Sequence, residues 1–77
     1  MIGKDWYRYL AATNQRIVEA RHRVGKQKDC IKKSKQEGRT TAALVVRLRS
    51  LEDALQDLMI RRERILQRVR SQPLPVG

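Results

Sequence analysis

The chain contains very few of the residues that form metal sites and disulfide bonds. Among its 77 residues there is one cysteine, Cys30, and one histidine, His22. A single cysteine cannot form a disulfide within the chain, and one cysteine with one histidine cannot complete a zinc site. We therefore expect a protein of a reducing compartment, with no metal and no cofactor, that is stabilised by packing and by self-association.

Long apolar runs and catalytic motifs are also missing. The longest apolar run, residues 42–46, is far shorter than the ~20 residues of a membrane span. The first ten residues include Asp5 and Arg8 and lack the apolar centre of a secretory signal. There is no glycine-rich phosphate loop and no nucleophile with a base at a defined spacing. These absences predict a cytoplasmic protein that is not an enzyme and does not span a membrane, so that binding to an anionic membrane surface is a minor alternative.

A regular apolar pattern fills the second half of the chain. Successive residues of this pattern are separated by alternating steps of four and three: Leu44, Leu48, Leu51, Leu55, Leu58, Arg62, Ile65 and Val69. This spacing predicts a helix with an apolar stripe, here called the seam, of the kind found in coiled coils. Arg62 is its polar member. It either extends into solvent or fixes the register of a partner helix, with Asn14 and Glu19 within its reach.

A weaker seam precedes it. Branched residues recur every seven positions at Leu10, Ile17, Val24 and Ile31, and the alternate seam positions hold the small or polar Thr13, Ala20, Gln27 and Ser34. Asp5 is suited to cap this helix, Gly38 to end it, and Thr40 or Thr41 to cap the next. Pro73 and Pro75 cannot continue a helix. We predict a lead-in at 1–4, a helix at 5–37, a turn at 38–40, a helix at 41–71 and a flexible tail at 72–77.

Two helices joined by so short a turn pack antiparallel. The predicted fold is therefore all-α, an antiparallel two-helix coiled-coil hairpin. A basic-zipper protein is the alternative, since the basic residues 21–35 precede the leucines, but that design needs one continuous helix and Gly38 interrupts it. At the open end, we expect Trp6, Tyr7 and Tyr9 to pack on Ile65 and Val69.

The second helix has more apolar residues than one neighbour can cover. Val45, Met59 and Leu66 form a stripe beside its seam, and Val46 and Ile60 lie next to them. Exposed apolar surface costs about 25 cal/mol per Å². We therefore predict that two hairpins form a homodimer, as a four-helix bundle, through Val45, Met59 and Leu66.

The charge is strongly positive, with 18 Lys and Arg against 8 Asp and Glu and a net charge of +10. If the turn centres near residue 39, the numbers of facing residues sum to about 78, and the acidic Glu52, Asp53 and Asp57 face basic residues of the first helix. This predicts a paired, neutral middle and two positive ends. The candidate polyanion-binding residues, at the turn end, are Lys32, Lys33, Lys35, Arg39, Arg47 and Arg49.

The run Gly38-Arg39-Thr40-Thr41-Ala42, the leucine pattern after it and the opening Trp6-Tyr7-Arg8-Tyr9-Leu10 resemble a group of small bacterial helical-hairpin proteins without an established activity. The resemblance implies a hairpin and a bacterial source, and it transfers no functional residues. The expected function is a non-enzymatic coiled-coil interaction module that self-associates and docks on a partner helix. The alternative is sequence-independent binding of nucleic acid by the basic ends of the hairpin.

Overall fold

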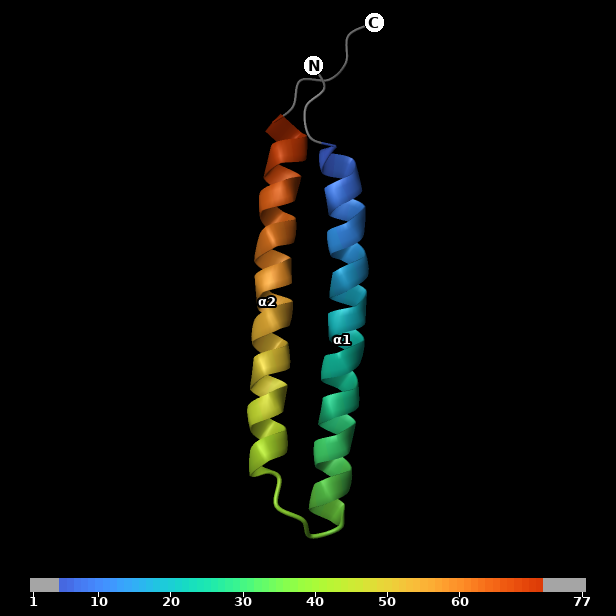
Figure 1. Cartoon of the computed structure of the whole chain (residues 1–77), viewed down its shortest axis with the longest axis vertical. Helices are drawn as coiled ribbons and strands as arrows, with labels where there is room; N and C mark the ends of the chain where they lie inside the picture. Colours follow the sequence, from blue (N-terminus) through green and yellow to red (C-terminus); the bar gives the residue numbers. More distant parts are fainter. Residues whose placement is uncertain (1–4, 72–77) are drawn as a thin grey trace, which may run out of the picture.

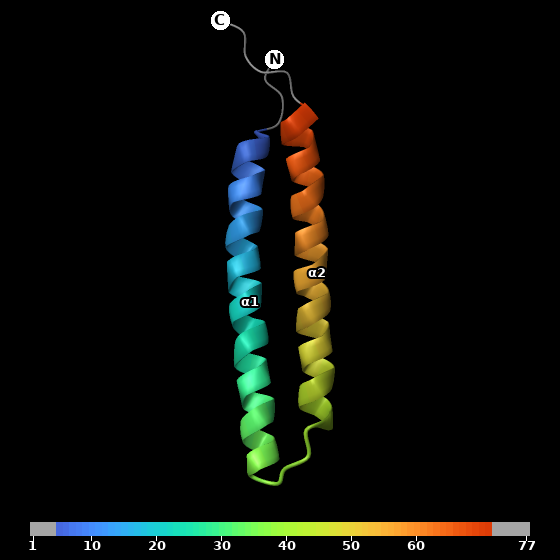
Figure 2. The ribbon, with the colours of Figure 1, turned by 180° about the vertical axis from the view of Figure 1, so that it is seen from behind.

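The computed structural model describes residues 5–71, which fold as a helical hairpin (Figure 1). Helix α1 spans Trp6–Gln36 and helix α2 spans Ala42–Ser71, and they lie side by side with opposite directions in both views (Figure 2). Both are rich in good helix formers and contain no proline. The predicted all-α two-helix hairpin is confirmed. The lead-in and the tail that the sequence predicts lie outside the described residues.

Caps define both ends of α1. The Asp5 carboxylate accepts a hydrogen bond from the Arg8 backbone N–H at 3.1 Å, so the helix begins one residue later, at Trp6. At the other end, the Gly38 N–H donates to the Lys35 carbonyl and the Arg39 N–H donates to the Ser34 carbonyl. Gly38 has a φ of 71°. These bonds with a left-handed glycine are the Schellman arrangement, which ends a helix and reverses the chain.

The linker of residues 37–41 shifts the register of the two helices. The first backbone bond of α2 runs from the Val45 N–H to the Thr41 carbonyl, and α1 reaches further toward the turn than the start of α2 does (Figure 1). A count centred on residue 39 would place Ser34 opposite Leu44. Instead, the Leu44 carbonyl oxygen accepts a hydrogen bond from the Gln27 side chain at 2.9 Å. Each residue of α2 near the turn therefore meets an earlier part of α1 than a symmetric turn would give.

Two glycine substitutions should change stability in opposite directions. Gly38→Ala puts a side chain on a left-handed residue and should lower the free energy of unfolding by about 1 kcal/mol, although no atom obstructs the added methyl group.

Gly25→Ala lies inside α1, where the added methyl group is equally unobstructed, and should raise the free energy of unfolding by about 1 kcal/mol. Urea denaturation followed by circular dichroism measures both. A loss of stability at Gly25 would show that another helix approaches this position closely.

The core is thin and asymmetric. Within residues 5–71 the buried apolar residues are Ile17, Val24, Ile31 and Ile65, with Thr13 as a buried polar neighbour, and no large side chain is completely enclosed. The seam leucines of α2 are all half-buried: Leu44, Leu48, Leu51, Leu55 and Leu58. Near Leu51 and Leu58, α1 offers only the small Ala20, and near Leu44 it offers the polar Gln27, so neither residue adds a large apolar side chain to the core. The hairpin alone thus leaves part of its leucine seam accessible.

Of the three aromatic residues at the open end of the hairpin, only Trp6 is half-buried. Its ring lies 5.9 Å, centroid to centroid, from the Tyr9 ring, and the Arg68 guanidinium carbon lies 5.9 Å from the centroid of the Trp6 ring. Tyr7 and Tyr9 are both exposed. The expected closure by three aromatic rings is therefore wrong for Tyr7 and Tyr9, which flank the seam one heptad before Asn14 and Arg16 and stay largely exposed. Neither of the described helices is long and apolar enough to cross a membrane.

Candidate functional site

The surface between the helices has two sides with different chemistry. Residues that directly follow seam positions, such as Asn14 and Arg21 on α1 and Met59 on α2, line one side. Residues that directly precede seam positions, such as Arg16 and Arg23 on α1 and Ala54 on α2, line the other. An antiparallel pair of helices requires this sorting, because like flanking positions then face each other across the seam. We call the two sides the methionine groove and the arginine groove.

The methionine groove has a volume of about 420 Å³. Its lining combines apolar and polar residues: Asn14, Ile17, Val18, Arg21, Met59, Arg62 and Glu63. Of the lining residues, Val18 is 61% exposed and Met59 is 41% exposed. Ile60, which follows Met59 in the chain, is 44% exposed. Of the predicted oligomer face, Val45 and Leu66 are half-buried and Met59 is exposed. This side therefore presents a discontinuous apolar surface to water.

The methionine groove also contains the polar member of the seam. Arg62 is exposed, and its Nε donates a hydrogen bond to the Asn14 Oδ1 at 2.8 Å, from one helix to the other. At the turn end, Gln27 occupies a seam position of α1 and bonds the Leu44 carbonyl. Gln27 and Arg62 thus each donate a hydrogen bond to the opposite helix. Since each bond forms in one register only, the pair selects a single alignment of the helices.

The arginine groove is formed by two adjoining hollows of about 300 and 190 Å³ that share Arg23 and Leu51. Its floor is apolar and consists of Ala20, Leu51, Ala54 and Leu58. Leu51 and Leu58 are seam leucines that remain half-buried, because Ala20 opposite them is small. The floor is therefore a strip of leucine surface that α1 does not cover.

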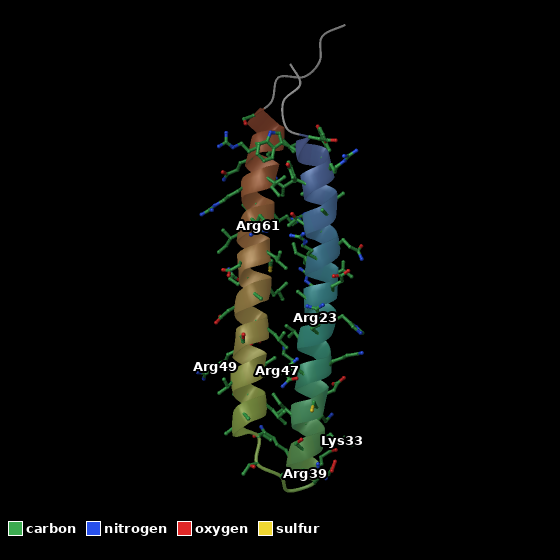
Figure 3. All side chains as sticks on the ribbon, in the orientation of Figure 1. Arg23, Lys33, Arg39, Arg47, Arg49 and Arg61 are labelled. Atoms are coloured by element: carbon green, nitrogen blue, oxygen red, sulfur yellow. The ribbon has the colours of Figure 1, made fainter. Side chains whose placement is uncertain are left out.

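The rim of the arginine groove is almost entirely basic. Arg16, Arg23, Lys26 and Arg47 line it, and Glu19 is the one acidic residue among the lining residues of the two hollows. In Figure 3, Arg47 extends from α2 toward α1. In the described chain none of these four cations takes part in an ion pair. The rim is therefore a set of like charges without acidic partners.

The predicted pairing of charges in the middle of the hairpin is wrong. The ion pairs within residues 5–71 are Arg8 with Asp5, Arg39 with Glu37 and Arg70 with Glu63, and none of them links α1 to α2. Glu52, Asp53 and Asp57 are exposed and form none. The seam spacing turns Asp53 and Asp57 to the outer face of α2, away from the cations of α1. The middle of the hairpin is neutral in sum but not paired.

The six candidate polyanion-binding residues at the turn end do not form one surface. Figure 3 shows Arg49 projecting from the outer edge of α2, Lys33 from the outer edge of α1 and Arg39 at the turn. Arg47 belongs to the arginine groove with Arg23. These residues lie at similar distances along the hairpin, but their side chains point in different directions.

The sequence does contain a signal for the arginine groove. The side chains recur at steps of seven: Arg16, Arg23 and Cys30 directly precede Ile17, Val24 and Ile31, and Arg47, Ala54, Arg61 and Arg68 directly precede Leu48, Leu55, Arg62 and Val69. None of these seven residues is acidic. Counting charge around each helix at steps of seven, rather than along the chain, would have found this surface. Comparison with known proteins adds no further residue, because no family model, no curated protein and no solved structure matches this chain.

Proposed function

We propose that this protein is a non-enzymatic coiled-coil interaction module that self-associates, with two hairpins forming a four-helix bundle through the methionine groove side. The observation that carries the proposal is the exposed apolar surface of Val18 and Met59 in this groove, with the exposed Ile60 next to Met59 in the chain, on a hairpin whose own core is thin. A single cysteine and a highly charged surface suit a cytoplasmic setting. A second hairpin offers what this surface needs, an apolar helix face of the same length.

The energetics favour a second copy. A core with few buried apolar side chains supplies little of the free energy that orders a chain of 77 residues. Each fully buried side chain of the size of Met59 or Ile60 contributes about 1.5–3 kcal/mol relative to its exposed state. Burying this surface in a symmetric dimer would also enclose both copies of the Arg62–Asn14 bond near the interface, which strengthens the preference for one register.

Nucleic-acid binding remains the second candidate, because basic residues without acidic partners occur on the described helices. A phosphate backbone needs such cations on a common face. The turn-end lysines and arginines are spread around the hairpin, so the rim of the arginine groove is the best surface for this alternative (Figure 3).

Single charges on the apolar side should dissociate the dimer. We expect the unchanged protein to sediment at twice its chain mass of 9.0 kDa, and Met59→Lys or Leu66→Glu to reduce this to the mass of one chain. A desolvated charge at the centre of an interface costs several kcal/mol, which exceeds the stability of a weak dimer. Analytical ultracentrifugation at several concentrations measures the mass.

His22→Lys is the matched control for Met59→Lys. It adds a lysine at an exposed position on the outer face of α1 and should leave the mass unchanged. Helical circular dichroism must persist in all variants, so that dissociation is separated from unfolding. A monomeric unchanged protein, or a Met59→Lys protein that remains dimeric, would refute self-association through this side.

A further inference from the structure

The arginine groove combines two features that are costly apart and useful together. Its floor exposes the flanks of Leu51 and Leu58, and apolar surface of this kind is stabilised when it is covered. Its rim brings Arg23, Lys26 and Arg47 to one hollow with no acidic residue among its lining. Neither feature stabilises the hairpin itself, because the leucines remain partly exposed to water and the cations repel one another.

The shape of the floor fits a helix. Leu51 and Leu58 are seven residues apart, two turns of the same face of α2. Between and opposite them lie Ala54 and Ala20, whose small side chains leave room for a large apolar residue from outside. A third helix lying along this side would place its own apolar seam on the two leucines, as the helices of a coiled coil do. Its flanking residues would then lie against the basic rim.

We infer that the arginine groove is a docking site for an acidic amphipathic helix of another protein. Charge complementarity selects the partner: a helix with leucines or isoleucines along its seam and Glu or Asp at the flanking positions would cover the floor and pair with Arg16, Arg23 and Arg47. Arginine suits such pairs because its guanidinium group donates two parallel hydrogen bonds to one carboxylate. The site lies on the side of the seam opposite the methionine groove, so it does not depend on self-association there.

A nucleic-acid backbone uses only half of this surface. Phosphate groups would pair with the rim, but they have no apolar group to place on Leu51 and Leu58. The leucine floor therefore favours a helix over a duplex, and a duplex serves as the competing ligand in the test.

The test measures fluorescence anisotropy of a labelled four-heptad peptide with leucine and isoleucine at its seam positions and glutamate at its flanking positions, added to the full chain at 150 mM salt. We expect saturable binding in the micromolar range. Three other labelled probes are measured in parallel: the same peptide with lysine in place of glutamate, the same peptide with alanine in place of its seam residues, and a DNA duplex of arbitrary sequence. Each of these should bind at least tenfold more weakly.

Three variants locate the site. Arg47→Glu removes a rim cation and should weaken binding of the acidic peptide at least tenfold. Arg49→Glu makes the same change of net charge on the outer edge of α2 and should alter binding less than threefold (Figure 3). Ala54→Lys keeps the surface basic and covers the floor, so it should weaken peptide binding at least tenfold without weakening any binding of the duplex. All three positions are exposed and helical, and circular dichroism verifies that each variant is folded.

Four results would overturn the inference. The acidic peptide fails to bind, or the peptide with an alanine seam binds equally well, which would show attraction by charge alone. In the third result the duplex binds more tightly than the peptide, and the surface is then a nucleic-acid site. Equal losses in Arg47→Glu and Arg49→Glu would likewise reject this groove. Met59→Lys, the variant that tests self-association, should bind the acidic peptide as the unchanged protein does, so the two proposals can fail separately.

Discussion

Replacing Ile17 by alanine is expected to lower the free energy of unfolding by about 3 kcal/mol. Ile17 is 5% exposed, occupies a seam position of α1 and lines the methionine groove beside Met59 and Arg62 of α2. The substitution removes three carbon atoms from the best-packed layer of a thin core. Neighbouring seam residues of α1, such as Thr13 and Ala20, are too small to fill the space. A protein of this size has a total stability of roughly 5 kcal/mol, so the variant should keep only about 2 kcal/mol and should unfold at a clearly lower temperature and urea concentration.

Val18→Ala is the matched control for this prediction. Val18 is the next residue of the same helix, is 61% exposed and loses two carbon atoms on substitution. At a protein concentration low enough for the hairpin to be monomeric, its alanine variant should change the free energy of unfolding by less than about 0.5 kcal/mol, since alanine also has the higher helix propensity. Thermal and urea unfolding compare the two variants at this one concentration, because a dimer makes stability depend on concentration. Similar losses in both variants at this concentration would contradict the prediction, whereas a loss for Val18→Ala that grows with concentration is expected if the dimer covers Val18.

The sequence predicts the architecture well because the helices and their ends are determined by residues close together in the chain. The seam of Leu44 to Val69 has a period that only a helix satisfies, and Gly38 provides the left-handed residue that ends the first helix. Proline is confined to positions after the second helix. The register of the two helices is harder to predict from the sequence. It depends on the path of residues 37–41 and on two long-range hydrogen bonds, from Gln27 and from Arg62, whose partners lie 17 and 48 residues away in the chain.

The candidate sites depend on the side of the helix to which each side chain points, and the position of a residue along the hairpin does not give this side. Lys33, Arg39 and Arg49 are close in distance along the hairpin, yet they point to different sides (Figure 3). Conversely, Arg23 and Arg47 are 24 positions apart in the sequence and line one hollow. The half-buried state of Leu51 and Leu58 also depends on pairing with Ala20, which requires the correct register. Helical period alone therefore predicts a seam but not what remains uncovered beside it.

An unpaired basic groove lowers the stability of the hairpin that carries it. Arg23, Lys26 and Arg47 repel one another across the seam, and the described chain gives them no acidic partner. A sequence under selection for stability alone would place Glu on one helix and Arg on the other. Residues that weaken a fold are typical of binding sites, where the partner supplies the missing interaction. Stability measurements can therefore test the docking site without any ligand.

Arg47→Glu should stabilise the hairpin by about 1–2 kcal/mol at low ionic strength, even though it should abolish docking of an acidic helix. The glutamate replaces repulsion from Arg23 and Lys26 by attraction, at a few tenths to one kcal/mol for each exposed contact. It also places a negative charge in the second turn of α2, near the positive end of the helix dipole. On its own helix no acidic residue lies three or four positions away. Thermal unfolding at 10 and 500 mM NaCl should show the gain shrinking as salt screens the charges.

The same exchange at Arg49 separates this effect from the change in net charge. Arg49→Glu lowers the net charge by the same amount and lies two residues further into α2, but Glu52 and Asp53 follow it by three and four residues on the same helix. It should therefore destabilise α2 by about 0.5 kcal/mol through repulsion between like charges. Opposite signs at Arg47 and Arg49 would show that the arginine groove, rather than the total charge, opposes folding. If Arg47→Glu instead lost stability, the groove cations would already be paired in the folded protein, and the argument that they await an acidic partner would fail.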